Sequence, residues 1–232
     1  MITCGVCGAQ NDDLSVVCSS CRGYLQGRVD ALDLFTTLWG LIESPTETFR
    51  RIVLAKHKNY GILLSSLFGV CLIFDIAWYK TLAPVFSSLT LLVGSALIGG
   101  PVVGIVTIFG FSILMRSITR VMGGRATRRN LFAAVAYATM PFALSLVFII
   151  PLEIAIFGMD FFGTNPPPML IRPVEYVLLL VLKAVAALYS LHLLVLGTMA
   201  ANAFEKKKYI PVAMSVVGAL ALGVVALGMV KV

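Results

Sequence analysis

The most regular feature of the sequence is a series of long apolar runs separated by short polar segments. A helix needs about 20 mostly apolar residues to cross roughly 30 Å of hydrocarbon, and several runs reach that length. They predict five transmembrane helices, at residues 61–80, 90–115, 131–157, 174–200 and 210–230. The fold class expected from this pattern is an all-α polytopic membrane protein.

Glycine and proline distinguish the second and third predicted spans. Gly100 and Gly104 stand about one turn apart in the second span, and such a small-xxx-small step lets another helix approach closely. The pattern leaves open whether that helix belongs to the same chain or to a second copy. Pro141 and Pro151 lie in the third span, where proline should kink the helix or split it.

Residues 30–58, ahead of the first span, are predicted to form amphipathic interfacial helices. Five apolar residues recur there at helical spacing: Leu34, Phe35, Leu38, Trp39 and Ile42. This stripe suits the headgroup boundary of a bilayer. Ser44, Pro45 and Glu47 predict a new helix start, with Ser44 and Glu47 as a capping box. Two helices packed on the membrane body fit the pattern equally well.

Two CxxC pairs, ten residues apart, occupy the polar N-terminus: Cys4, Cys7, Cys18 and Cys21. Zinc prefers four tetrahedral ligands, and thiolate is a common one. So short a segment cannot bury a useful core, so the metal would supply most of its folding free energy. We therefore predict a zinc ribbon at residues 1–27. Since no histidine lies near the cluster, the zinc is expected to be structural.

Two disulfides or a redox dithiol are the alternative interpretations of this cysteine pattern. Residues 1–30 contain no apolar h-region, so we expect no secretory signal peptide. The head should then stay in a reducing compartment, which favours metal binding over disulfides. Cys71 lies within an apolar run and is expected to be a small buried hydrophobe.

Composition excludes an ordinary soluble domain. The 232 residues are 59% hydrophobic and 12% charged, with a mean hydropathy of +0.97; soluble domains have about a quarter charged residues. The formal charge of +7 could indicate nucleic acid or an anionic membrane surface. In a multi-span protein the positive-inside rule is the simpler source. Arg22 and Arg28 are too few to predict nucleic-acid binding by the head.

The basic residues divide unequally between the two sides of the predicted spans. Three lie on one side: Lys80, Arg172 and Lys231. Fourteen lie on the other: Arg22, Arg28, Arg50, Arg51, Lys56, Lys58, Arg116, Arg120, Arg125, Arg128, Arg129, Lys206, Lys207 and Lys208. This asymmetry predicts a cytoplasmic N-terminus and a C-terminus outside.

Four ionisable residues fall within or near the predicted spans: Asp75, Glu153, Lys183 and His192. The first three lie in the outer halves of their spans. An ionised group at that depth needs a partner or a water-filled cavity, so we predict that Lys183 pairs with Asp75 or Glu153. The cluster suits a buried pair that sets helix register, or a polar pathway for an ion or small substrate. His192 is expected to form an interhelical hydrogen bond.

Two segments resemble the Yip1 family in its prokaryotic form, which carries an N-terminal zinc ribbon. One runs from Trp39 through Ser44-Pro45 to Ile52, and the other from Gly123-Gly124-Arg125-Ala126-Thr127 to Pro141. The resemblance covers roughly residues 35–230 and implies a five-span membrane domain, placed at residues 61–230. It also implies a prokaryotic cytoplasmic (inner) membrane. Eukaryotic members are associated with small GTPases, vesicle traffic and membrane shaping. The zinc ribbon stands where those members have a long cytoplasmic region, so GTPase binding is not carried over.

Two functions are compatible with these features. The first is a non-catalytic adaptor or membrane-organising protein whose zinc ribbon and basic loops contact a cytoplasmic protein partner or anionic lipid. The alternative is a small transporter or channel subunit with a polar site at Asp75, Glu153 and Lys183. An enzyme is not expected, because HExxH, GxSxG and P-loop motifs do not occur. The sequence leaves open whether the chain forms a homo-oligomer.

Overall fold

The computed structural model describes residues 2–4, 7–11, 17–23, 25, 32–86 and 88–229. Two short strands precede the helices: β1 (Ile2–Thr3) and β2 (Gln10–Asn11). The α-helices are α1 (Leu34–Glu43), α2 (Pro45–Leu54), α3 (Gly61–Tyr79), α4 (Leu89–Val121), α5 (Arg128–Ala138), α6 (Met140–Phe157), α7 (Pro168–Ile171), α8 (Pro173–Asn202) and α9 (Tyr209–Met229). Two 3-10 helices lie at Gly158–Phe162 and Lys206–Lys208.

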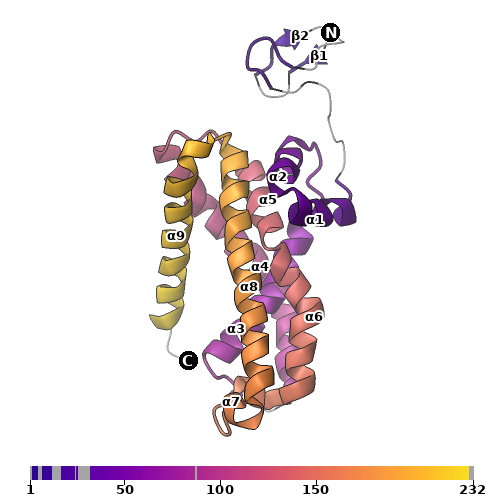
Figure 1. The fold of residues 1–232 in the computed structure, drawn as a ribbon, viewed down its shortest axis with the longest axis vertical. Helices are drawn as coiled ribbons and strands as arrows, with labels where there is room; N and C mark the ends of the chain where they lie inside the picture. Colours follow the sequence, from indigo (N-terminus) through magenta and orange to yellow (C-terminus); the bar gives the residue numbers. More distant parts are fainter. Residues whose placement is uncertain are drawn as a thin grey trace.

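The long helices run side by side along the molecule, with α1 and α2 at one end and α7 at the other (Figure 1). Within the described residues, four helical segments are long and apolar enough to cross a membrane. They are α3, α4, the α5–α6 stretch Arg128–Phe162, and α8. The predicted polytopic helical fold is confirmed to this extent. The fifth predicted span coincides with α9, a helix that packs against α4 and α8.

The third predicted span is interrupted, as its prolines suggested. The α-helix ends at Ala138 and begins again at Met140, which places Pro141 in the first turn of α6. Proline is tolerated there because the first N–H groups of a helix have no intrahelical acceptor. Pro151 lies inside α6, which continues past it to Phe157. The break comes from Pro141 alone.

Close backbone contact between α3 and α4 depends on three glycines. A Cβ atom on Gly100 would lie 2.7 Å from the Cα of Val70. One on Gly104 would collide with the carbonyl oxygen of Ser65, and one on Gly69 with that of Gly100. The small-xxx-small step predicted from Gly100 and Gly104 therefore packs within this chain.

The two N-terminal helices α1 and α2 differ in how they use their apolar residues. In α2, Phe49 and Ile52 are fully buried against the membrane body. In α1, Leu41 is buried, whereas Phe35 is 77% and Trp39 58% exposed. Of the stripe predicted for a headgroup boundary, Phe35, Trp39 and Ile42 point outward. Leu38 instead packs against the buried cluster of the body, and Leu34 is half-buried.

The predicted capping box at the start of α2 is wrong. Ser44 occupies the N-cap position, but its side chain makes no capping hydrogen bond. Its backbone N–H, which the Glu47 carboxylate would have to reach, already donates to the carbonyl oxygen of Gly40. Ser44 ends α1 as well as beginning α2, and the contact with α1 takes the donor that a capping box requires.

The membrane body has two buried clusters. The first surrounds α5, in which every residue from Ala133 to Ala138 is buried between neighbouring helices. The second, toward the α7 end, includes Phe74 of α3 and Phe161 and Phe162 of the 3-10 helix Gly158–Phe162.

Candidate functional site

The four N-terminal cysteines lie together in a geometry that fits a tetrahedral metal site. Their sulfur atoms all lie within 4.8 Å of one another. The Sγ atoms of Cys4 and Cys21 are 3.6 Å apart, as are those of Cys7 and Cys18. Four sulfurs at 2.3 Å from a zinc ion would be separated by about 3.8 Å, whereas a disulfide requires about 2 Å. The donor set therefore fits a metal ion with four thiolate ligands.

A backbone hydrogen bond of the same kind closes each of the two CxxC segments. The N–H of Gly8 donates to the carbonyl of Cys4 at 2.9 Å, and the N–H of Arg22 donates to that of Cys18 at 2.9 Å. Gly8 and Arg22 both have positive φ angles, 75° and 57°. Glycine adopts that conformation readily, and Arg22 adopts it at the equivalent place in the second turn. The head is thus built from two matching knuckles.

Asn11 supports the second knuckle, and sequence reasoning missed it. Its side-chain oxygen accepts hydrogen bonds from the N–H and hydroxyl of Ser19, and its amide nitrogen lies 3.5 Å from the sulfur of Cys18. The backbone N–H of Cys21, together with that of Ser20 and the Asn11 side chain, lowers the pKa of the Cys18 thiol to about 6. Donors aimed at sulfur stabilise the thiolate, the form that binds metal.

Three segments rich in basic residues meet at the end of the body that carries α1 and α2. Arg129 donates to the carbonyl of Lys56 at 2.6 Å, and Lys208 donates to that of Met122 at 2.7 Å. The first bond joins the segment before α3 to the first turn of α5, and the second joins the α4–α5 loop to the 3-10 helix between α8 and α9. We refer to this region as the basic end.

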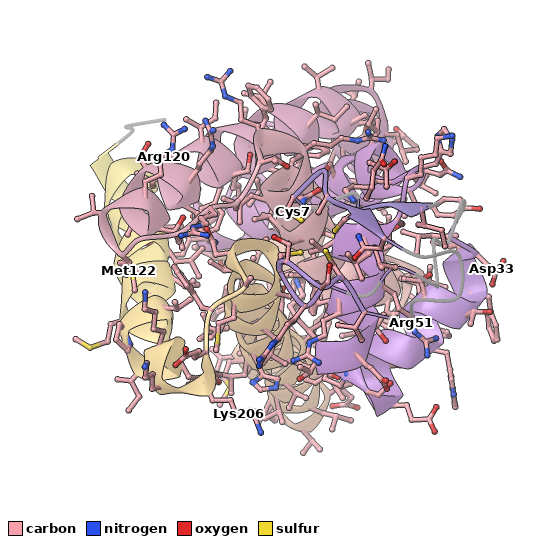
Figure 2. The ribbon with its side chains drawn as sticks, turned by 90° about the horizontal axis from the view of Figure 1, so that it is seen from above. Cys7, Asp33, Arg51, Arg120, Met122 and Lys206 are labelled. Atoms are coloured by element: carbon pink, nitrogen blue, oxygen red, sulfur yellow. The ribbon has the colours of Figure 1, made fainter. Side chains whose placement is uncertain are left out.

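Figure 2 looks down on the basic end and shows Arg51, Arg120 and Lys206 well apart from one another around it. They belong to α2, to α4 and to the 3-10 helix Lys206–Lys208, respectively. Lys80 and Arg172, two of the three basic residues predicted for the other side, follow α3 and precede α8 at the opposite end. Arg28 and Lys231 lie outside the described residues.

The prediction that Lys183 pairs with a carboxylate inside the membrane body is confirmed, with both candidates as partners. Its ammonium nitrogen donates to Oδ1 of Asp75 at 2.8 Å and lies 3.0 Å from Oε1 of Glu153. The Asp75 side chain is 31% exposed, whereas that of Glu153 is fully buried. α3, α6 and α8 each contribute one member of this cluster, which we call the charged triad.

A cavity of about 290 Å³ borders the charged triad. Asp75, Lys183 and Ser145 line it together with apolar side chains, and Glu153 is not among the lining residues. The Lys183 ammonium also lies 5.4 Å from the ring centroid of Phe161. Trp78 lines this cavity and a second one, of about 310 Å³, near α7.

His192 and Cys71 take the roles that the sequence predicted. The Nδ1 atom of His192 in α8 lies 3.2 Å from the hydroxyl of Tyr209, which begins α9. Cys71 is buried, and its thiol also donates to the carbonyl of Phe142 at 2.9 Å.

Asn202, at the end of α8, makes two hydrogen bonds that sequence reasoning missed. Its side-chain oxygen accepts from the N–H of Ala126 at 3.2 Å, and its amide donates to the carbonyl of Thr198 at 2.9 Å. A buried amide at the end of an apolar span was the available signal. The contact holds the α4–α5 loop against α8 at the basic end.

Lys58 is a second missed contact. Its ammonium group donates to the carbonyls of Ile52, Val53 and Ala55 at 2.8, 2.9 and 3.0 Å. These acceptors belong to the last turn of α2 and the residue after it, where carbonyls lack intrahelical partners. One of the fourteen basic residues is therefore committed to ending a helix.

Comparison with known proteins identifies the family of the chain. No curated protein and no solved structure matches it. The model of the Yip1 domain matches residues 39–227, from Trp39 in α1 to α9. This match covers well over half of the sequence and includes all four candidate membrane spans. The chain belongs to the Yip1 domain family.

Proposed function

We propose that this protein is a non-catalytic membrane adaptor that organises other components at one face of a bilayer. The observation that carries the proposal is the meeting of three basic segments at one end of an otherwise apolar bundle. Exposed cations close to a membrane surface attract anionic lipids, each contributing about 1 kcal/mol. The basic end would contact anionic lipid headgroups or an acidic protein surface.

The N-terminal head would hold a structural zinc ion through Cys4, Cys7, Cys18 and Cys21. Support comes from the four converging sulfur atoms and from the small size of the apolar cluster around them. The buried side chains among the described residues of the head are too few to stabilise a domain by themselves, so metal binding would contribute most of its folding free energy. A rigid zinc-bound head would offer a surface for a protein partner.

The orientation follows from the positive-inside rule. We place the basic end and the head in the cytoplasm of a prokaryotic cell, with the α7 end outside. In this arrangement α9 is the fifth span and brings the C-terminus to the outer side. The length of α9, 21 residues, is enough to cross the hydrocarbon.

Lipid capture by the full chain tests the adaptor proposal. The chain is reconstituted in nanodiscs of mixed neutral and anionic lipid, and its bound anionic lipids are counted by native mass spectrometry. The triple variant Arg120→Gln/Arg125→Gln/Lys206→Gln removes exposed charges and spares Lys208, which binds Met122. We expect at least a tenfold weaker, less salt-dependent lipid association. The double variant Lys80→Gln/Arg172→Gln at the other end is the control.

Equal lipid counts in the triple variant and the wild type would rule out lipid contact by the basic end. Protein contact by the head is tested separately, by comparing partners captured by the full chain and by its Cys4→Ser/Cys7→Ser variant. Identical partner sets would show that the head is not the docking surface.

A small transporter or channel subunit is the second candidate. The charged triad and the cavity beside it favour this function, because charges at membrane depth usually mark a substrate or ion path. Ion or solute flux in proteoliposomes that disappears in Lys183→Met would support it. A bilayer that stays tight with the wild-type protein would exclude it for the solutes tested.

A further inference from the structure

We propose that the charged triad binds one exchangeable proton, held on Glu153. The site is built from Asp75 in α3, Glu153 in α6 and Lys183 in α8. Proton binding by this site does not depend on whether the protein transports anything. The proposal rests on a charge count, on the burial of Glu153 and on the cavity that reaches the other two residues.

When all three of its groups are ionised, the charged triad needs one more positive charge to be neutral. Two carboxylates and one ammonium, all ionised, carry a net charge of −1. Lys183 lies ten residues into α8, about 15 Å from its start at the 1.5 Å rise of a helix. A net charge at this depth is far more costly than a neutral set of the same groups. One additional positive charge makes the cluster neutral.

The geometry indicates which carboxylate takes that charge. The Asp75 side chain is 31% exposed, and its carboxylate accepts a hydrogen bond from Lys183. The carboxyl group of Glu153 is fully buried. Its Oε1 contacts Lys183 at ion-pair distance without hydrogen-bond geometry, and its Oε2 has no hydrogen-bond partner among the described residues.

The missing charge is a proton rather than a metal ion. A metal ion would need several ligands. Among the described residues, the group of three or more His, Cys, Asp or Glu side chains that could hold one is the N-terminal cysteine cluster, not the charged triad. A proton needs only the carboxylate itself. When it binds, an O–H bond forms on the ionised carboxylate, the net charge rises by one and no electrons are transferred.

The surroundings of the charged triad offer a route by which a proton can reach Glu153 and few other groups that could bind that proton. The Lys183 ammonium, which lines the 290 Å³ cavity, would give one of its protons to Glu153 across their 3.0 Å contact. The neutral amine left behind would then take a replacement proton from water entering the cavity, so that Lys183 regains its charge. The other titratable groups on the packed elements are engaged or remote. Cys71 of α3 donates to Phe142, Tyr176 of α8 accepts from Trp78, Asp160 of the 3-10 helix is exposed, and Tyr137 of α5 lies toward the basic end.

Infrared spectroscopy of the full chain in lipid nanodiscs tests the proposal. A protonated carboxylic acid has a carbonyl stretch that an ionised carboxylate lacks, and it shifts when H₂O is replaced by D₂O. At neutral pH we expect this band in the wild type and in Asp160→Asn, which removes an exposed carboxylate at the same end. In Glu153→Gln the band should be lost. The fold should be kept, because glutamine reproduces the neutral form of glutamate.

Other outcomes would overturn the assignment. A wild-type spectrum without the band would mean that the triad is ionised. If labelling the side-chain carboxyl of aspartate with ¹³C shifts the wild-type band, and the same labelling of glutamate does not, the proton lies on Asp75. Loss of the band on adding sodium chloride, but not choline chloride, would identify a metal cation as the ligand. If Glu153→Gln fails to fold, the wild-type band, its response to sodium and its shift on ¹³C labelling of glutamate still test the assignment to Glu153.

Discussion

At the scale of single residues, packing of the membrane body depends on glycines, which have no side chain, as well as on its buried side chains. Gly69, Gly100 and Gly104 bring the backbones of α3 and α4 into direct contact. Between helices in lipid, packing of this kind replaces the hydrophobic effect as a source of stability. At Gly94 and Gly110 of α4, an added Cβ atom would meet none of the described residues within 4 Å, so glycine has no packing role there.

We predict that Gly104→Ala destabilises the protein by about 1–3 kcal/mol, as overpacking of a tight interface does. The added methyl group would lie 2.7 Å from the Cα of Gly69 and closer still to the carbonyl oxygen of Ser65. The matched variant Gly110→Ala adds the same atom in open space and should be neutral or slightly stabilising. Unfolding midpoints in one detergent, measured for both variants, check this. Equal midpoints would contradict the close α3–α4 contact.

The role of a residue could be predicted from the sequence where its depth in the membrane or its spacing along the chain is enough to decide that role. Lys183 had to find a partner because of its depth, and the structure gives it two. The roles of Asn202 and Lys58 depend on which segments meet in the folded chain, which periodicity does not encode. The failed capping box has the same origin, because the N–H of Ser44 is taken by the preceding helix.

At the scale of elements, the N-terminal head and the membrane helices are stabilised differently. The described apolar cluster of the head consists of Cys4, Cys18 and Leu25 with Ile2 and Ala9 packed against it. Two of these residues are proposed metal ligands. The membrane helices, in contrast, have extensive buried surfaces of their own. Loss of the metal should therefore affect the head alone.

We predict that the purified chain carries one zinc ion, and that Cys7→Ser or a strong chelator removes it. Without the metal the head should unfold and be cleaved by protease, while the helical circular dichroism of the body stays unchanged. Cys71→Ser is the matched control, because Cys71 lies in α3 and its replacement can still donate to Phe142. Metal content by mass spectrometry gives the answer. A full complement of zinc in Cys7→Ser would refute the four-cysteine site.

The apolar pattern predicted the helices to within a few residues for α3, α8 and α9, because their ends coincide with polar or proline residues. It placed the end of α4 six residues too early, since Arg116 and Arg120 were assigned to the loop. The ends of long basic side chains can reach the interface while their Cα atoms stay helical. Pro141 predicted that the third span would be interrupted. It did not predict that the interruption would fall at Thr139.

At the scale of the whole molecule, the two ends of the bundle have different chemistry. The basic end gathers polar loops, exposed cations and the outward-facing Trp39 and Phe35 of α1. The opposite end holds short aromatic-rich turns around Phe161 and Tyr176. Aromatic side chains thus lie at both boundaries, and the excess of basic residues at one of them suits a fixed orientation in a bilayer.

We predict that alkaline phosphatase, which folds only outside the cytoplasm, is active when inserted after Asn165 or fused after Val232. It should be inactive when inserted after Arg125 or Glu205. Enzyme activity in intact bacterial cells, normalised to expression, is the measurement. The same activity at Glu205 and Val232 would mean that α9 does not cross the membrane. Activity after Arg125 would reverse the orientation.

The backbone contact between α3 and α4 also has a consequence for biosynthesis. Where Gly69 meets Gly100 and Gly104, peptide groups of one helix shield those of the other. Either helix entering the bilayer by itself would leave this strip of main chain facing acyl chains that fill it poorly. The two segments are consecutive in the chain, so they should leave the translocation machinery as a preassembled helical hairpin. The later helices would then assemble around that pair.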